Sequence, residues 1–210
     1  MKKIILTTLI AVLTISSVSA QATFGIKGGV NFASIMGDTP NGVKYRTAWN
    51  VGIVAEIETS SNTSVQPEIM YSSQGLKFDG GLVNGEIRGE NEVTLDYLNI
   101  PIVFKYYFKE GFSFETGPQL GFLLSSTSKD EAVSSSELNN LLTTASFDWL
   151  LGFGYKFENG FNVNARYNFG FTNIWKGPTS NRPQYPPYYY YYDYGKRNSV
   201  FQLTVGYYFN

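Results

Sequence analysis

The chain has 210 residues, a formal net charge of −1, and neither histidine nor cysteine. A nearly neutral charge offers nothing to attract nucleic acid, and without cysteine the chain can form neither a disulfide framework nor an acylated lipoprotein cysteine. The missing histidine removes histidine-dependent catalysis, and zinc and thiol chemistry lack their ligands, so we expect no enzyme, no metal and no cofactor.

The first twenty residues have the layout of a secretory signal peptide. Lys2 and Lys3 precede an apolar run from Ile4 to Ile15, and small residues follow up to Ala20. The run is too short to cross a bilayer as a helix. We therefore predict cleavage after Ala20 and a single mature domain over residues 21–210.

The remainder of the chain alternates apolar and polar residues with a period of two, which is typical of strands whose faces meet different surroundings. Phe161–Thr172 is the clearest case, because one parity is apolar or aromatic throughout and the other is polar or small. The pattern predicts about eight strands, at Thr23–Ala33, Thr47–Glu58, Thr63–Phe78, Glu92–Phe108, Phe112–Leu124, Phe147–Phe157, Phe161–Thr172 and Ser199–Phe209.

The connections between these strands alternate in length. Asn159-Gly160 is a strong hairpin signal, because both central positions of such a turn need positive φ. The other short connections are Thr59–Asn62 and Lys109–Gly111. The long, polar connections are Ser34–Arg46, Asp79–Asn91, Ser125–Thr143 and Asn173–Asn198.

Tight turns at one end and long loops at the other are typical of outer-membrane barrels. We therefore predict an all-β fold: a closed, up-and-down, antiparallel transmembrane β-barrel with long extracellular loops. The protein would be a monomer in the outer membrane of a Gram-negative bacterium, with both termini in the periplasm. The alternative is a soluble up-and-down barrel, which would have to crowd its aromatic residues into a narrow interior.

The two faces of each strand can be assigned from the alternation. The residues expected to meet lipid include Trp49, Val51, Ile53, Ala55, Ile57, Leu98, Ile100, Ile102, Phe104, Tyr106, Phe201, Leu203, Val205, Tyr207 and Phe209. The opposite parity places eight charged residues in the lumen, Lys27, Glu56, Glu68, Lys105, Glu115, Asp148, Lys156 and Arg166. We interpret them as a polar core, because side chains fill the interior of so small a barrel; a proton relay or a selectivity ring is the alternative.

Aromatic residues indicate which end of the barrel carries the loops. Trp49, Trp149 and Trp175 all fall toward the long connections, and amphipathic rings favour the headgroup level of a membrane. We therefore expect all three tryptophans near one rim.

The last long connection contains the most unusual stretch of the sequence. Tyrosine provides rigid, amphipathic contact area, so we expect a surface-binding loop for a glycan, a protein or lipopolysaccharide. Its residues would be Arg182, Tyr185, Tyr188, Tyr189, Tyr190, Tyr191, Tyr192, Tyr194, Lys196 and Arg197. The alternatives are a tyrosine girdle that rests on the outer leaflet and a low-complexity loop tip.

Five strings resemble the outer-membrane β-barrel domain family found across Bacteroidetes, often called PorT-like. They are FGIKGGVNF at Phe24–Phe32, VQPEIMYSSQG at Val65–Gly75, YLNIPIVFKYYF at Tyr97–Phe108, GPQLG at Gly117–Gly121 and GYYF at Gly206–Phe209. The resemblance implies a barrel embedded in outer-membrane lipid and gives no biochemical role. We expect a structural or surface-binding protein; the alternative is a small conduit or an accessory of outer-membrane transport or protein secretion.

Overall fold

The computed structural model describes residues 22–37, 43–79, 82–83, 86–87, 90–128, 140–176 and 195–209. No helix in this described part of the chain is long and apolar enough to cross a membrane. Its strands are β1 (Ala22–Met36), β2 (Val43–Lys44), β3 (Arg46–Ser60), β4 (Thr63–Asp79), β5 (Leu82–Val83), β6 (Glu86–Ile87), β7 (Glu90–Lys109), β8 (Phe112–Ser128), β9 (Ala145–Lys156), β10 (Phe161–Asn173) and β11 (Arg197–Phe209).

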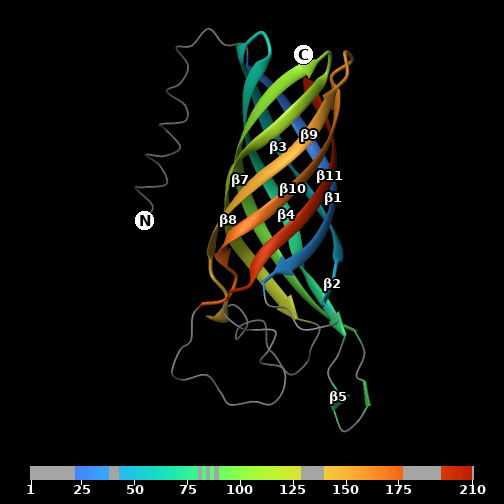
Figure 1. Cartoon of the computed structure of the whole chain (residues 1–210), viewed down its shortest axis with the longest axis vertical. Helices are drawn as coiled ribbons and strands as arrows, with labels where there is room; N and C mark the ends of the chain where they lie inside the picture. The colour runs from blue at the N-terminus through green and yellow to red at the C-terminus, as the bar shows by residue number, and fades with distance from the viewer. Residues whose placement is uncertain are drawn as a thin grey trace.

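The eight long strands form one closed, antiparallel barrel (Figure 1). Their order is β4-β3-β1-β11-β10-β9-β8-β7, and pairing of β4 with β7 closes the ring. Strands β1 and β11 pair from Phe24 opposite Phe209 to Met36 opposite Arg197, so the two ends of the barrel sequence share one seam. The predicted fold, an up-and-down barrel of eight strands, is confirmed.

Tight turns join the strands at the end of the barrel drawn at the top of Figure 1, which we call the turn side. Gly160 has a φ of +88° in the turn between β9 and β10, and Gly111 has a φ of +75° between β7 and β8, where only glycine is unstrained. Strands β9 and β10 pair from Lys156 opposite Asn162 onward, which confirms the Asn-Gly hairpin. The opposite end, with the long connections, is the loop side.

The alternation of side chains produces an apolar exterior. Large hydrophobic residues point outward and are widely exposed, among them Ile53 at 57% and Phe153 at 61%. The alternate positions, such as Glu68 and Arg166, are buried in the lumen. A soluble barrel would have the opposite distribution, so the predicted assignment of the two faces is confirmed.

Three adjacent strands each carry a proline near mid-height. Backbone pairing skips the residues around Pro67 between β3 and β4, around Pro101 between β4 and β7, and around Pro118 between β7 and β8. Proline has no N–H to donate to a ladder. The register is the same on both sides of each gap, so the prolines interrupt hydrogen bonds without shifting the strands.

Several strands run a few residues farther on the loop side than the alternation predicts. Strand β8 continues to Ser128 instead of Leu124, and β1 continues to Met36 instead of Ala33. Ile35, an inward residue of the β1 extension, is apolar and buried, whereas the inward residue of the β8 extension is the buried Ser126. Through Ile35, the extra length of β1 contributes to an apolar cluster over the loop-side mouth of the lumen.

Candidate functional site

The turn-side half of the lumen holds a chain of alternating charges. It begins at Lys27 on β1, whose Nζ lies 3.1 Å from Glu68 Oε1 on β4. Arg166 on β10 holds both oxygens of Glu68, at 3.0 Å and 2.9 Å. Its Nε also lies 2.6 Å from Glu115 Oε2 on β8. One guanidinium therefore joins two carboxylates in the geometry that suits its planar fork.

The chain continues toward the turn-side rim. Lys105 Nζ on β7 lies 3.6 Å from Glu115 Oε1 and 3.5 Å from Glu56 Oε1 on β3. Lys156 Nζ on β9 follows at 3.4 Å from Glu56 Oε2 and 4.0 Å from Glu58 Oε1. Seven of the eight predicted lumen charges thus meet in one chain, each from a different strand.

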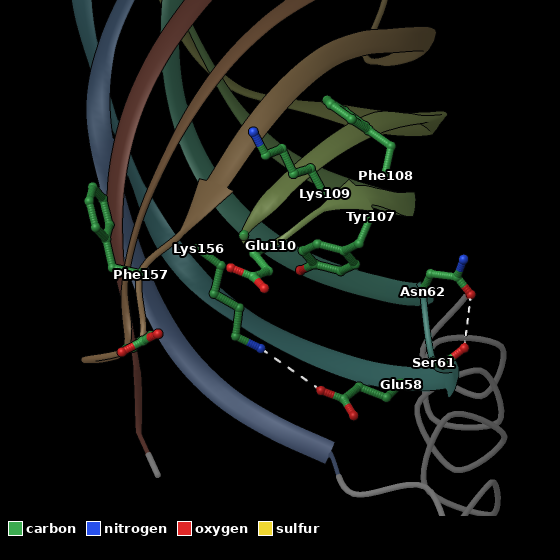
Figure 2. Close-up of a pocket in the computed structure, with 12 residues that line it drawn as sticks. Glu58, Ser61, Asn62, Tyr107, Phe108, Lys109, Glu110, Lys156 and Phe157 are labelled. Carbon is green, nitrogen blue, oxygen red and sulfur yellow. Dashed lines mark hydrogen bonds and ion pairs between the residues drawn. The ribbon is translucent and has the colours of Figure 1, made fainter.

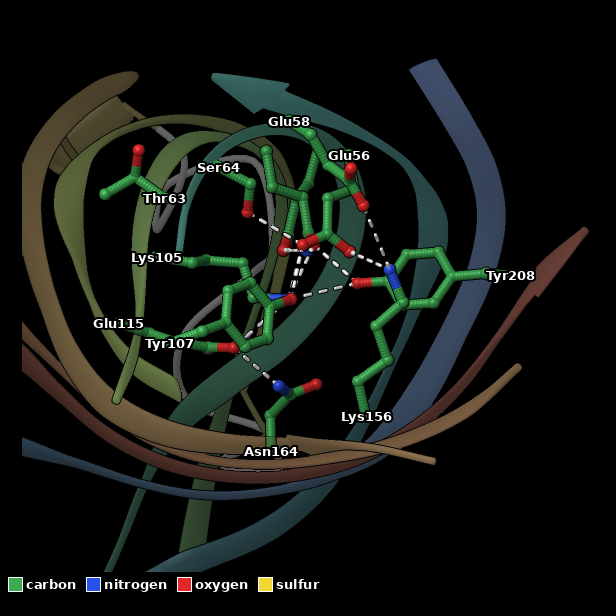
Figure 3. A network of polar contacts seen from close by, with 12 residues as sticks. Glu56, Glu58, Thr63, Ser64, Lys105, Tyr107, Glu115, Lys156, Asn164 and Tyr208 are labelled. Atoms are coloured by element: carbon green, nitrogen blue, oxygen red, sulfur yellow. Dashed lines mark hydrogen bonds and ion pairs between the residues drawn. The ribbon is translucent and has the colours of Figure 1, made fainter. Parts of the chain in front are cut away.

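Neutral groups donate further hydrogen bonds to the carboxylate oxygens that face Lys105 (Figure 3). Glu56 accepts hydrogen bonds from the Ser64 hydroxyl, at 2.7 Å, and from the Tyr107 hydroxyl. Asn164 donates to Glu115 Oε1 at 2.7 Å. Buried charges persist only when they are both paired and hydrogen-bonded, and these carboxylates meet both conditions.

The remaining strand, β11, contributes a tyrosine to the same network. Tyr208 donates to Gln66 Oε1 at 2.6 Å, and Lys105 Nζ lies 3.2 Å from the Tyr208 hydroxyl. Lys156 Nζ stands 5.0 Å from the centre of the Tyr208 ring, within the range of a cation–π contact. Every long strand is therefore tied into one polar core.

This polar core excludes solvent. Glu115 and Gln66 are 0% exposed, and Lys27, Glu68 and Arg166 are 2–3% exposed. Residues that line a water-filled channel would be accessible. The geometry is that of a packed interior, as expected for a barrel of eight strands.

A hollow of about 590 Å³ lies between the core and the turn-side mouth (Figure 2). Its lining includes Glu58, Tyr107, Lys109, Glu110 and Lys156, so charges of both signs surround it. Lys156 points across the mouth to Glu58. The hollow ends at the polar core.

The eighth predicted lumen charge, Asp148 on β9, lies apart from this chain. It points into the lumen and is 4% exposed, but it takes part in none of the ion pairs among the described residues. Its Oδ2 accepts hydrogen bonds from Gln119 at 3.2 Å and from Ser146 at 3.1 Å. Asp148 is nearer the loop side, in a layer of neutral amides and hydroxyls.

An apolar cluster closes the loop-side mouth. Its buried members are Ile35, Leu76, Val93, Leu95, Tyr97, Leu142, Ile174 and Trp175. Leu142 and Trp175 come from the segments beside β9 and β10 and pair with each other in an isolated bridge. Trp175 is 3% exposed, so the expectation that it lies at the membrane rim was wrong. Its segment turns into the barrel mouth, where backbone bonds join Ile174 to Thr143 and Lys196.

Most of the predicted surface-binding loop lies outside the described residues: Arg182, Tyr185, Tyr188, Tyr189, Tyr190, Tyr191, Tyr192 and Tyr194. Arg197, at the start of β11, is exposed as expected. Lys196 is only 2% exposed, which corrects its expected place on the surface. The chain turns at Gly195, with a φ of +101°, and Lys196 O then accepts a hydrogen bond from Ile174 N, which draws it into the mouth.

The sequence-based interpretation left out the two tyrosines of the polar core and the apolar cluster. Tyr107 and Tyr208 occupy the inward parity of β7 and β11, so the alternation that placed Lys105 in the lumen also marks them. Leu142 and Trp175 lie outside the regular strands and carry no periodic signal.

The fold, its apolar exterior and its packed polar lumen define an integral outer-membrane barrel. Residues 17–176 match the sequence model of the family described as "Outer membrane protein beta-barrel domain", and the chain belongs to this family. Membership places the protein in the outer membrane of a Gram-negative bacterium. No curated protein matches it in sequence.

Solved structures share the architecture at low sequence identity. Neisserial surface protein A is 12% identical with a TM-score of 0.52, over 89% of this chain and 97% of that one. Ail of Yersinia pestis, solved with the heparin analogue sucrose octasulfate, is 11% identical with a TM-score of 0.48, over 90% and 99%. OprG of Pseudomonas aeruginosa is 15% identical with a TM-score of 0.42, over 91% and 97%. The likeness to the neisserial protein supports the fold alone.

Proposed function

We propose that this protein is a sealed, non-enzymatic anchor in the outer membrane that acts through its long loops at the cell surface. The observation that carries the proposal is the closed lumen, with buried ion pairs such as Arg166–Glu68 toward the turn side and the apolar cluster around Trp175 at the loop side. A barrel closed at two levels offers no route for solutes. The long loops are then the part of the protein that contacts other molecules.

The orientation in this proposal places the tight turns and both ends of the mature chain in the periplasm. Outer-membrane barrels have short periplasmic turns and longer extracellular loops. Strand β1 begins and β11 ends on the turn side, so cleavage of a signal peptide after Ala20 would release the mature chain with its first strand at the periplasmic rim.

The tyrosine-rich stretch is the part of the loops that we propose for binding a surface glycan, a protein or lipopolysaccharide. Tyrosine supports such contacts because it combines a large ring with a hydroxyl at a small conformational cost. The test is adhesion of whole cells that express the protein with Tyr188–Tyr192 replaced by serine, a change that keeps the loop length. Adhesion should fall while the boiled and unboiled gel positions of the barrel stay as in the wild type.

Removal of the larger segment Pro183–Tyr194, twelve residues, provides the second arm, and removal of Lys129–Leu138, ten residues from another long connection, is its control. Loss of barrel stability with unchanged adhesion would contradict the binding proposal. Equal loss of adhesion from both deletions would show that loop bulk, and not the tyrosines, makes the contact.

A conduit, or a PorT-like accessory of protein secretion, is the competing proposal. The hollow at the turn-side mouth favours it, because a periplasmic partner or solute would enter there. Planar-bilayer recordings distinguish the two. A sealed anchor gives no stable single-channel steps, and regular steps from the purified wild-type protein would establish the conduit.

A further inference from the structure

The middle of the lumen contains buried oxygens that have no hydrogen-bond partner. They lie between the ion chain and the apolar cluster and include Asp148 Oδ1, Asn99 Oδ1 and Asn168 Oδ1. These three residues are 2–4% exposed. Buried acceptors of this kind are costly unless something satisfies them.

Asp148 carries the only charge in this group. Both of its side-chain partners, Gln119 and Ser146, are neutral. Arg166 pairs opposite Gly152, about 13 Å along the strand from Asp148 at roughly 3.3 Å per residue, and it is held by two other carboxylates. A buried carboxylate without a partner charge is strongly disfavoured, so this one calls for a counter-charge.

Two glycines leave room beside these oxygens. Gly170 lies opposite Asp148 on β10, and a Cβ there would stand 3.1 Å from Asp148 Oδ1. Gly121 lies opposite Ser146 and Asn99, and a Cβ there would stand 2.5 Å from Ser146 Oγ and 2.9 Å from Asn99 Oδ1. A side chain at either position would press on the oxygens.

We propose that a monovalent inorganic cation binds at Asp148 in the closed lumen, through the carboxylate and neutral oxygens of the same layer such as the Ser146 hydroxyl. Carboxylate, amide and hydroxyl oxygens are ligands for hard cations. One carboxylate balances a single positive charge. Divalent ions favour several carboxylates, and the described residues contain no group of three or more acidic, histidine or cysteine side chains that could hold a metal.

The position of the site predicts slow exchange of the bound ion. Lys27, Lys105, Lys156 and Arg166 lie on the turn side of it, and the apolar cluster covers it on the loop side. On the turn side, an approaching cation meets a packed core whose charges are already paired and whose central side chains are not exposed to solvent. The bound ion therefore exchanges slowly and enters as the barrel folds or as the apolar cluster opens.

The direct test uses rubidium as the probe. The full mature protein is refolded into detergent micelles in rubidium chloride, passed rapidly through a desalting column and analysed for its elements. About one rubidium ion per chain should remain with the wild type and none with Asp148→Asn. Absence of retained rubidium in the wild type, or equal retention by Asp148→Asn, would overturn the proposal.

A second measurement does not depend on retention. Unfolding temperature is compared in potassium chloride and in N-methylglucamine chloride at equal ionic strength. The wild type should gain on the order of 3 °C with the small cation, the shift expected of a bound ligand worth about 1 kcal/mol in a chain of this size, and Asp148→Asn should gain none. Asp96→Asn, which removes a carboxylate hydrogen-bonded to Ser125, is the matched control and should keep the wild-type gain.

An infrared difference spectrum, wild type minus Asp148→Asn, distinguishes an ionised Asp148 carboxylate from a protonated carboxyl group. An ionised carboxylate signal in potassium chloride supports the cation. A protonated carboxyl band at neutral pH would overturn it, because Asp148 would then be neutral and need no counter-ion. If Asp148→Asn does not fold, wild-type rubidium retention alone still decides the question.

Discussion

The two closed regions of the lumen exclude water by opposite means. On the turn side, buried carboxylates, amines and a guanidinium fill the barrel and satisfy one another, as in the pair of Arg166 with Glu68. On the loop side, mostly apolar side chains packed around Trp175 fill it, and no ion pair among the described residues involves them. Both regions are almost inaccessible to solvent, so accessibility alone does not tell them apart.

The two regions therefore differ in how well they tolerate substitution. An apolar cluster tolerates rearrangement if its volume is kept. A buried ion chain does not, because Arg166, Lys105 and Lys156 each contact two carboxylates and the loss of one cation leaves charges without partners. The ion chain also joins strands far apart in sequence, such as β4 and β10, and therefore favours one register of the closed barrel.

The largest effect on stability is expected from Arg166→Met, which tests the ion chain. Methionine keeps much of the side-chain volume but removes the charge that joins Glu68 and Glu115. Breaking a buried pair from one side costs about 3–5 kcal/mol, so the free energy of unfolding in urea should fall by that amount. Lys109→Met, at an exposed turn-side position, is the control. Equal stability of the two variants would mean that the chain contributes no net stabilisation.

The apolar region is tested by Trp175→Ala. Truncation leaves a cavity among Leu95, Leu142 and Ile174, and large-to-small changes of this kind cost about 3–5 kcal/mol in a packed core. We expect the lower end of that range, because the cluster lies at the mouth. Trp49→Ala is the matched control, since Trp49 is outward and 54% exposed. Bilayer recordings of Trp175→Ala should stay silent because the ion chain still closes the lumen; conduction would show that the apolar cluster is the only seal.

Leu203→Arg tests the outer face of the barrel, because it places a charge on the side that we assign to lipid. Leu203 is central in β11, points outward and is 45% exposed. Arginine on the lipid face near the bilayer centre costs about 2–4 kcal/mol, whereas Arg166 in the lumen is paired with two carboxylates. Unfolding in lipid vesicles measures the loss. Thr204→Val, at the neighbouring inward position, is the control, and an unperturbed Leu203→Arg would contradict the assigned lipid face.

The sequence predicts the wall of the barrel well, for a physical reason. Period-two alternation reports directly which face of a strand meets lipid, and Asn159-Gly160 reports a turn that needs positive φ. These local signals determine the number of strands, the faces and the turn side. The ends of β1 and β8 were less predictable, because beyond the lipid belt the outward face becomes polar, as at Thr127, and the alternation weakens.

The sequence predicts which residues point into the lumen better than it predicts which of them contact one another. Inward parity placed Asp148 with the other charges, but the stagger between strands decides which side chains share a level, and it puts Gln119 and Gly170 beside Asp148. Trp175 was placed at the rim because an aromatic residue near a strand end usually lies there. Its burial depends on backbone pairing of two irregular segments, which composition does not report.

The smallest expected effect is at the boundary between the ion chain and solvent. Lys156 is 28% exposed at its side chain and contacts Glu56 and Glu58 at the edge of the turn-side hollow. Lys156→Gln should lower the free energy of unfolding by about 1 kcal/mol or less, the range of partly exposed pairs, because Glu56 keeps Lys105 and two hydroxyl donors.

The salt dependence of the stability loss from Lys156→Gln shows where the solvent-excluded core ends. An exposed pair is screened, so the difference between wild type and Lys156→Gln should shrink as salt is raised, whereas the loss from Arg166→Met should stay constant. A Lys156→Gln loss as large as that of Arg166→Met, and equally insensitive to salt, would extend the dry core to the turn-side rim. The hollow would then lie wholly outside the sealed lumen, which would weaken the case for a periplasmic entrance.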